Sequence, residues 1–130
     1  MSDIEILFQY RLQQASETLN DPERMLSDNY SPRSIVNRAY YVVYYSLLAL
    51  YIKTNINVRT SKHAGIISIF DKEFVHKGIF NQKYSKIVHY LFELRQEFDY
   101  KELIEVSHKD ASDCVNKAKD FFAAISESIA

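Results

Sequence analysis

The sequence is poor in the residues that interrupt regular structure. Its 130 residues include two glycines, two prolines and one cysteine, and no tryptophan. So few glycines and prolines leave little material for tight β-turns, which favours long helices. A glycine-rich phosphate-binding loop is excluded for the same reason. The single cysteine, Cys114, excludes an internal disulfide framework and a cysteine metal cluster, and it fits a reducing compartment.

Signals for export or membrane insertion are also lacking. The amino-terminal stretch MSDIEILFQY has no basic region followed by an apolar run, so it does not resemble a signal peptide. The most apolar run, residues 39–52, contains five tyrosines and is too short to span a bilayer. We therefore expect a cytoplasmic protein with a single domain over residues 1–130, which is long enough to bury a core.

The sequence does contain apolar residues at the spacing of an α-helix. Apolar residues recur at spacings of three and four within residues 3–19, 32–53, 61–76, 82–98 and 108–128. The stretch NDPE, residues 20–23, predicts the end of the first helix and a polar loop over residues 20–30. The sequence therefore predicts an all-α fold, an antiparallel up-and-down helical bundle of four long helices plus short helical pieces.

Two helix starts and one helix end have specific signals. Ser31 followed by Pro32 is typical of a capped start with proline in the first turn. Ser107 with Asp110 three residues later is typical of a capping box. Gly78 predicts the stop of the third helix.

Charge is unevenly distributed although the net charge is only −1. Residues 53–89 carry seven basic and two acidic side chains, whereas both flanking segments are net negative. The basic side chains of this block are Lys53, Arg59, Lys62, Lys72, Lys77, Lys83 and Lys86. They could contact a phosphate backbone or an acidic protein partner, or they could simply form solvated helix faces.

The stretch LFELRQEFDY, residues 91–100, places a charge inside an apolar arc. Arg95 projects about 40° from Leu91 on a helix, on the same side as Leu94 and Phe98. A guanidinium on a buried face is costly unless it is paired. One interpretation is a structural ion pair with Asp99, one turn later.

The alternative is a small polar pocket around Arg95. Asp99, Tyr100 and His63 would complete this pocket, with Arg95 binding a phosphate. Tyr100 or His63 would assist as a hydrogen-bond donor or acid. These three side chains and Arg95 are our candidate site, and the sequence does not establish that they converge.

The tyrosine-rich helix over residues 32–53 supplies further candidates. One side carries Tyr40, Tyr44 and Tyr51, and another carries Tyr41 and Tyr45 together with Arg38. These rings could form a core or dimer face with satisfied hydroxyls. They could also line a site for a base or ribose, with Arg38 adding a cation–π or phosphate contact.

Metal and nucleophilic sites have weak support. Glu-x-x-His occurs at residues 73–76 and 105–108, but one copy falls at a helix end and the other in an irregular segment. A di-iron bundle needs such motifs in mid-helix, facing the core. Cys114 lies on an apolar helix side, where an inert thiol is the default. We expect no metal and no cofactor.

Three stretches together resemble the HEPN family. They are NRAYYVVYYSLLALY, SKHAGIISIFDKEFVHKGIF and YSKIVHYLFELRQEFDY, in that order and spacing. More narrowly they are similar to a branch of small stand-alone bacterial and archaeal proteins, marked here by Arg38–Tyr41, His63–Gly65 and Arg95–Tyr100. The resemblance covers about residues 30–125. It implies an antiparallel helical bundle, commonly a homodimer, often encoded beside a minimal nucleotidyltransferase as a toxin–antitoxin-like pair.

The resemblance also implies that catalytic members of the family cleave RNA without a metal. They use an arginine that is followed, after four to six residues, by a histidine, and two such motifs meet across a dimer. Here the residues at those positions after Arg95 are Tyr100, Lys101 and Glu102, and Arg59 precedes His63 by one residue too few. Arg95 matches the family arginine, and no residue matches the histidine.

Three functions stay open. The first is a toxin-like or binding partner of a minimal nucleotidyltransferase, with nucleotide or RNA binding near Arg95. The second is a metal-independent ribonuclease using Arg95 with Tyr100 or His63. The third is a purely structural dimeric interaction module.

Overall fold

The computed structural model describes residues 2–100 and 105–129, without the side chains of Asp99 and Tyr100. Within these residues the chain forms five α-helices and one π-helical turn, and no strand. The elements are α1 (Asp3–Ser27), α2 (Pro32–Lys53), α3 (His63–Phe70), the π turn η1 (Asp71–Val75), α4 (Gln82–Tyr100) and α5 (His108–Ser128). The predicted all-α helical bundle is confirmed.

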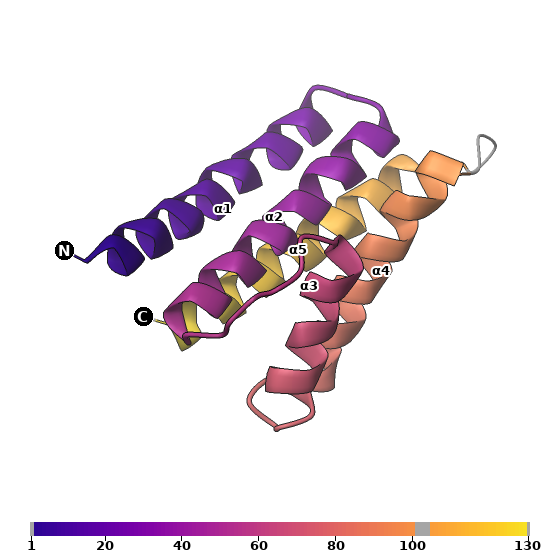
Figure 1. Cartoon of the computed structure of the whole chain (residues 1–130). Coiled ribbons are helices and arrows are strands. Elements are labelled where there is room, and N and C mark those ends of the chain that lie inside the picture. Colours follow the sequence, from indigo (N-terminus) through magenta and orange to yellow (C-terminus); the bar gives the residue numbers. More distant parts are fainter. Residues whose placement is uncertain (1, 101–104, 130) are drawn as a thin grey trace.

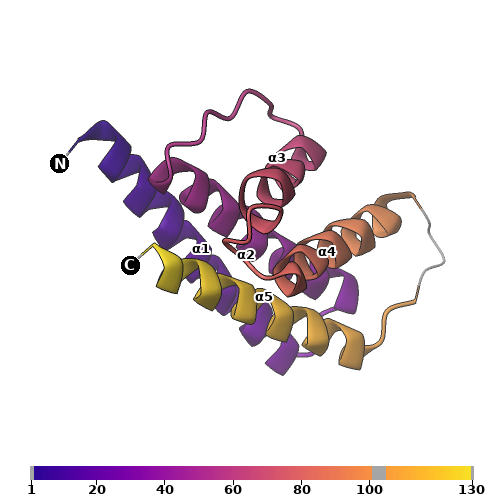
Figure 2. The ribbon, with the colours of Figure 1, turned by 90° about the horizontal axis from the view of Figure 1, so that it is seen from below.

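The long helices run in alternating directions along the chain. Helices α1, α2, α4 and α5 form the bundle, and α3 with η1 lies alongside α4 and also contacts α2 (Figure 1). The view from below shows α2 between α1, α5 and the α3–α4 pair (Figure 2). Because α2 contacts every other α-helix, its side chains link the core to any site formed by α3 and α4.

Helix α2 is built for this central position. It starts as predicted, with the Ser31 hydroxyl accepting a hydrogen bond from the Ser34 amide and Pro32 in the first turn. Half of its residues are buried, including polar Ser46, whose hydroxyl donates to the Val42 carbonyl at 2.7 Å. Each large apolar side chain buried this way contributes about 1.5–3 kcal/mol to the free energy of unfolding.

Helix α1 is longer than the sequence predicts. The break expected at residues 20–23 is wrong, because the helix continues through Pro22 to Ser27. Proline in a helix interior costs about 3 kcal/mol, since it cannot donate to the carbonyl four residues earlier. Pro22 is buried, and Met25 and Leu26 beyond it pack against the core. Burial of this last turn against α2 offsets the local cost.

The helix ends agree with their sequence signals. Gly78 has φ of 75°, the left-handed conformation expected at its stop. Ser107 and Asp110 form the predicted capping box, with each side chain accepting from the other's amide. The third helix runs nearly to its predicted end but changes to π-helical bonding at Asp71, whose carbonyl accepts from the His76 amide at 2.8 Å.

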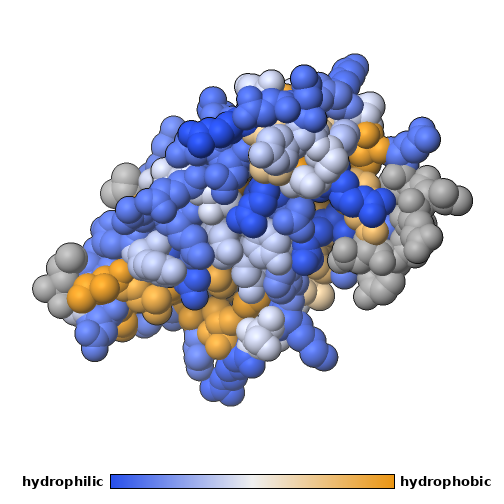
Figure 3. All heavy atoms as spheres, turned by 90° about the horizontal axis from the view of Figure 1, so that it is seen from above, coloured by the Kyte–Doolittle hydropathy of each residue, from blue (hydrophilic) through white to orange (hydrophobic). Residues whose placement is uncertain are grey.

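The surface is mostly hydrophilic in the view from above, with apolar atoms gathered in patches (Figure 3). The most exposed large apolar side chains of α1 are Ile4, Ile6, Leu7 and Tyr10. Across the described residues no helix combines the length and the apolar character needed to cross a membrane.

Candidate functional site

An aromatic cluster around Tyr40 joins α2 to α3. Tyr40, Tyr41 and Tyr44 come from α2, and His63 is the first residue of α3. Helical spacing places the Tyr40 and Tyr44 rings nearly parallel, with centroids 6.1 Å apart. The Tyr40 ring is fully buried, so this cluster forms a packed aromatic surface that a charged side chain of α4 can contact.

Arg95 is that charged side chain. Its guanidinium carbon lies 4.9 Å from the Tyr40 ring centroid and 5.2 Å from that of Tyr41. One terminal nitrogen donates a hydrogen bond to the Tyr41 hydroxyl at 3.2 Å. Its Nε is buried and has no hydrogen-bond partner among the described residues. The guanidinium is thus held by aromatic faces, which attract cations through their quadrupole.

His63, the first residue of α3, also contacts Tyr40. Its Nδ1 lies 2.7 Å from the Tyr40 hydroxyl, and its ring stacks on Tyr44 at 4.3 Å. Burial lowers the pKa of His63, and the nearby charge of Arg95 lowers it further. Burial also raises the pKa of Tyr40 well above its ordinary value, which outweighs the opposing effect of Arg95. Both groups are therefore neutral near pH 7.

The structure thus brings His63 and Arg95 to one tyrosine. The sequence could not establish this, because the two residues lie 32 positions apart on different helices. Gly65 helps to position His63, since a Cβ there would lie 2.6 Å from the Thr60 Cγ2. The predicted contributions of Asp99 and Tyr100 fall on side chains outside the described residues, so the Arg95–Asp99 ion pair stays a prediction.

A hollow beside the cluster is lined by three arginines. It has a volume of about 380 Å³, and its lining residues are Met25, Arg33, Ser34, Asn37, Arg38, Arg95 and Phe98. No acidic side chain belongs to this lining within the described chain. We call this feature the arginine hollow. Its charge composition suits an anion.

Arg38 and Arg33 are held on aromatic faces as Arg95 is. The Arg38 guanidinium carbon lies 5.4 Å from the Tyr41 ring centroid, and that of Arg33 lies 5.0 Å from the Phe98 ring centroid. The Arg38 Nε is buried and unpartnered within the described residues, like that of Arg95. Two guanidinium groups therefore contact the Tyr41 ring, and each has an Nε without a partner among the described residues.

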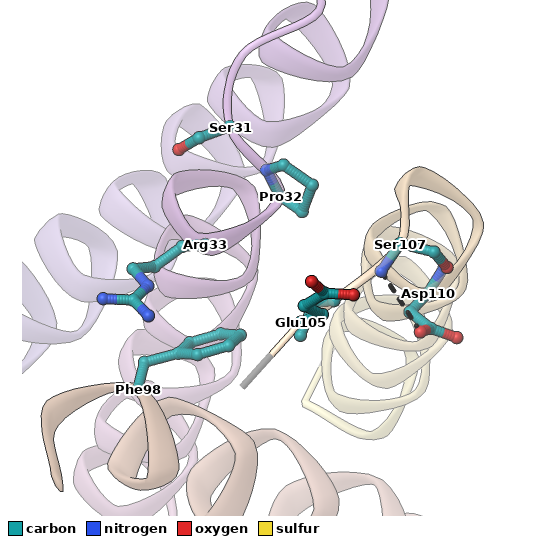
Figure 4. A pocket seen from close by; sticks show the side chains of 8 residues that line it. Ser31, Pro32, Arg33, Phe98, Glu105, Ser107 and Asp110 are labelled. Carbon is teal, nitrogen blue, oxygen red and sulfur yellow. Dashed lines mark hydrogen bonds between the residues drawn. The ribbon is translucent and has the colours of Figure 1, made fainter. Parts of the chain in front are cut away.

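A neighbouring hollow shares Arg33 and Phe98. The close-up shows Arg33 next to the Phe98 ring, with Glu105, Ser107 and Asp110 across from them (Figure 4). Two carboxylates line this second hollow, so its charge is mixed. Of the two hollows, only the arginine hollow has positive charge without a carboxylate among its described lining residues.

The predicted ligand-binding residues divide into two groups. Arg38 lines the hollow and Tyr41 touches two of its arginines, whereas Tyr45 contacts the cluster through Tyr41, with ring centroids 5.7 Å apart. Arg33 and Asn37 line the hollow but were missed by the sequence reasoning. Their spacing of four, with Tyr41 four residues further along the same side of the helix, is the signal that could have identified them.

Metal-binding geometry is not found in the described chain. No group of three histidine, cysteine or acidic side chains there lies close enough to hold an ion. His76 and His108, the histidines of the two Glu-x-x-His motifs, are both exposed.

The chain also matches known proteins. The HEPN domain model matches residues 8–129. The chain belongs to the HEPN domain family. A UPF0332 protein of Thermotoga maritima is 34% identical over 129 residues, covering 99% of this chain and 96% of that protein.

Two further relatives come from Methanocaldococcus jannaschii, and both bear the name "Putative toxin". One is 35% identical over 98 residues, covering 75% of this chain and 71% of its own length. The other is 26% identical over 110 residues, covering 85% and 73%. In this HEPN chain the histidine nearest to Arg95 in the cluster comes from α3 and does not follow Arg95 on α4.

Proposed function

We propose that this HEPN protein is toxin-like and binds the phosphate of a nucleotide, free or within RNA, in the arginine hollow. The observation that carries the proposal is that three arginines, Arg33, Arg38 and Arg95, line a hollow whose described lining has no carboxylate. The Nε atoms of Arg38 and Arg95 are also buried without a hydrogen-bond partner among the described residues. A buried donor on a charged group costs free energy until it is hydrogen-bonded. A phosphate accepts several such bonds at once and neutralises the charge.

Binding to labelled nucleotides tests this proposal. Fluorescence anisotropy would compare a fluorescein-labelled single-stranded RNA with labelled AMP, to separate RNA from free nucleotide. We expect Arg38→Ala and Arg95→Ala to weaken binding by about tenfold each, since a charged hydrogen bond contributes about 1.5–3 kcal/mol. Arg59→Ala removes one charge from an exposed loop arginine and is the matched control. Equal weakening by the control, or no saturable binding of either ligand, would contradict the proposal.

We further propose that the protein acts with a minimal nucleotidyltransferase. Two lines support this: the toxin-like names of two relatives and the family resemblance described above. Copurification of the chain with a nucleotidyltransferase encoded beside it tests the pairing. A stable complex is expected, and two proteins that elute independently when mixed would oppose it.

A metal-independent ribonuclease is the second candidate. The favouring observation is that a neutral histidine and a guanidinium both contact Tyr40. A neutral imidazole can take part in proton transfer, and a guanidinium can stabilise phosphate charge. The Tyr40 hydroxyl already occupies Nδ1 of His63, which leaves only Nε2 for this chemistry.

Cleavage assays separate this candidate from binding alone. Purified protein would be incubated with RNA in the presence of a chelator, beside Arg95→Ala and His63→Gln. Cleavage lost in both variants would assign the chemistry to this site. Intact RNA with retained binding would leave phosphate binding as the function and exclude the ribonuclease.

A further inference from the structure

A third hollow lies on another side of α4, away from the arginines. It has a volume of about 720 Å³ between the first turns of α4 and the middle of α5. Its lining residues are Asn81, Gln82, Lys83, Lys86, Ile87, Tyr90, Lys117 and Asp120. Lys86 and Arg95 are nine residues apart, so they project to opposite sides of the helix. We call this feature the lysine groove.

The charge of the lysine groove is only partly compensated. Lys83 forms an ion pair with Asp120 at 2.9 Å. Lys86 and Lys117 also line the groove, and neither is within ion-pair distance of a carboxylate in the described chain. The first turn of α4 contains no acidic residue, although the amino end of a helix favours negative charge. Positive charge therefore accumulates at this end of the groove.

Apolar surface lies between these lysines. Ile87 is buried beneath the groove, and Tyr90 is 40% exposed within it. The Lys117 ammonium lies 5.3 Å from the Tyr90 ring centroid, so the lysine rests on the aromatic face. A groove with an apolar floor and positive sides matches a segment that combines carboxylates with an apolar or aromatic anchor.

We propose that the lysine groove docks an acidic segment of a partner protein, anchored by one apolar or aromatic side chain on Ile87 and Tyr90. The inference goes beyond phosphate binding, because it assigns a protein contact to a different face of the molecule. Nucleic acid fits this groove less well. The planar fork that binds phosphate with two bonds is absent, because no arginine lines the groove.

A peptide probe tests the proposal on the intact chain. The probe is a fluorescein-labelled peptide, Glu-Glu-Leu-Leu-Glu-Phe-Glu. The control is a peptide in which every glutamate is replaced with glutamine. Binding is read by anisotropy and by backbone amide shifts of Lys86, Tyr90 and Lys117. The acidic peptide should bind and shift these amides, and the glutamine peptide should bind about tenfold more weakly.

A pair of double variants gives the matched comparison. Lys86→Glu with Lys117→Glu reverses both uncompensated charges and should abolish peptide binding. Lys72→Glu with Lys109→Glu makes the same change in net charge at exposed sites outside the groove and should leave binding within about twofold. Circular dichroism would verify that both variants fold.

Several outcomes would overturn the proposal. Equal loss in both double variants would mean general charge attraction and no docking site. Equal binding of the two peptides would remove the role of the lysines. Binding of a short uridine oligonucleotide that is lost only in the groove variant would reassign the groove to nucleic acid. The arginine hollow is unchanged in these variants, so its proposed function is tested separately.

Discussion

Arg95 is a charged side chain within the helical bundle, and no carboxylate pairs with it among the described residues. Its guanidinium lies against two tyrosine rings and donates to one hydroxyl, while its Nε stays unsatisfied within the described residues. Each cation–π contact contributes about 0.5–2 kcal/mol, which offsets part of the desolvation cost. The remaining cost is what a bound anion would relieve.

His63 makes the folded protein sensitive to acid. Its pKa is lowered in the folded state, first by burial and then by Arg95, whereas the unfolded residue titrates near 6.5. As the pH falls through 6.5, the unfolded chain takes up a proton that the folded chain does not. The free energy of unfolding therefore decreases, until the pH is below the folded pKa and both states are protonated.

Urea unfolding at about pH 7.5 and about pH 5.5 measures this effect. The wild-type protein should lose more stability on acidification than His63→Gln, which lacks the titrating ring. Because other groups titrate in the same range, the difference between the two proteins is the readout. Parallel losses in both proteins would show that the fold does not hold His63 in its neutral form.

Cys114 should be chemically inert in the folded protein. Burial raises the pKa of its thiol to about 11. At pH 8 only about one thiol in a thousand is then ionised, and the thiolate is the reactive species. A colorimetric disulfide reagent should react at least about a hundredfold faster after unfolding in urea than before. Equal rates before and after unfolding would contradict the buried position of Cys114.

At the scale of elements, Gly65 fixes the start of α3. A Cβ at this position would lie 2.6 Å from Thr60 Cγ2 and 3.0 Å from its Oγ1, closer than packed atoms allow. Gly65→Ala should therefore lower the free energy of unfolding by about 1–3 kcal/mol, the usual cost of overpacking. Thermal unfolding followed by circular dichroism measures the loss.

Removing the opposing atoms provides the control. The Thr60 hydroxyl accepts from the Lys62 amide, so Thr60→Ala alone should be mildly destabilising. Combined with Gly65→Ala, it should restore part of the lost stability. Additive losses in the double variant would show that the two positions do not clash.

The helices themselves were largely predictable from the sequence. Local signals identified the start of α2 at Ser31–Pro32, the capping box of α5 and the stop at Gly78, because each depends on neighbours within one turn. The end of α1 was not predictable in this way. Pro22 breaks a helix locally, and only packing of the following turn against α2 sustains it.

At the scale of the whole molecule, only some residues of the candidate site could be predicted from the sequence. Arg95 was identified because a charge interrupts an apolar arc, and Arg38 because it lies beside tyrosines on one helix side. Their proximity to His63 depends on how α3 packs against α2 and α4, which no local pattern encodes. Arg33 was missed because an exposed arginine in a first helical turn is ordinary, and only its spacing to Asn37 and Tyr41 links it to the site.

If RNA binds in the arginine hollow and not in the lysine groove, only a change in the arginine hollow should alter the salt dependence of RNA binding. Each phosphate contact to single-stranded nucleic acid adds about 0.7 to the slope of log affinity against log salt. Arg95→Ala should reduce this slope by about 0.7, whereas Lys86→Glu, on another side of α4, should leave it unchanged. A slope that drops equally in both variants would indicate diffuse electrostatic attraction.

The most direct measurement follows the arginine side-chain Nε–H groups by ¹⁵N NMR while AMP or a short single-stranded RNA is added. Resonances of Arg38 and Arg95 would be assigned from the alanine variants. Binding in the arginine hollow predicts large, saturable shifts of these two signals, with Arg59 unmoved. If a ligand binds while both Nε–H signals stay at their starting positions, the hollow is not the phosphate site.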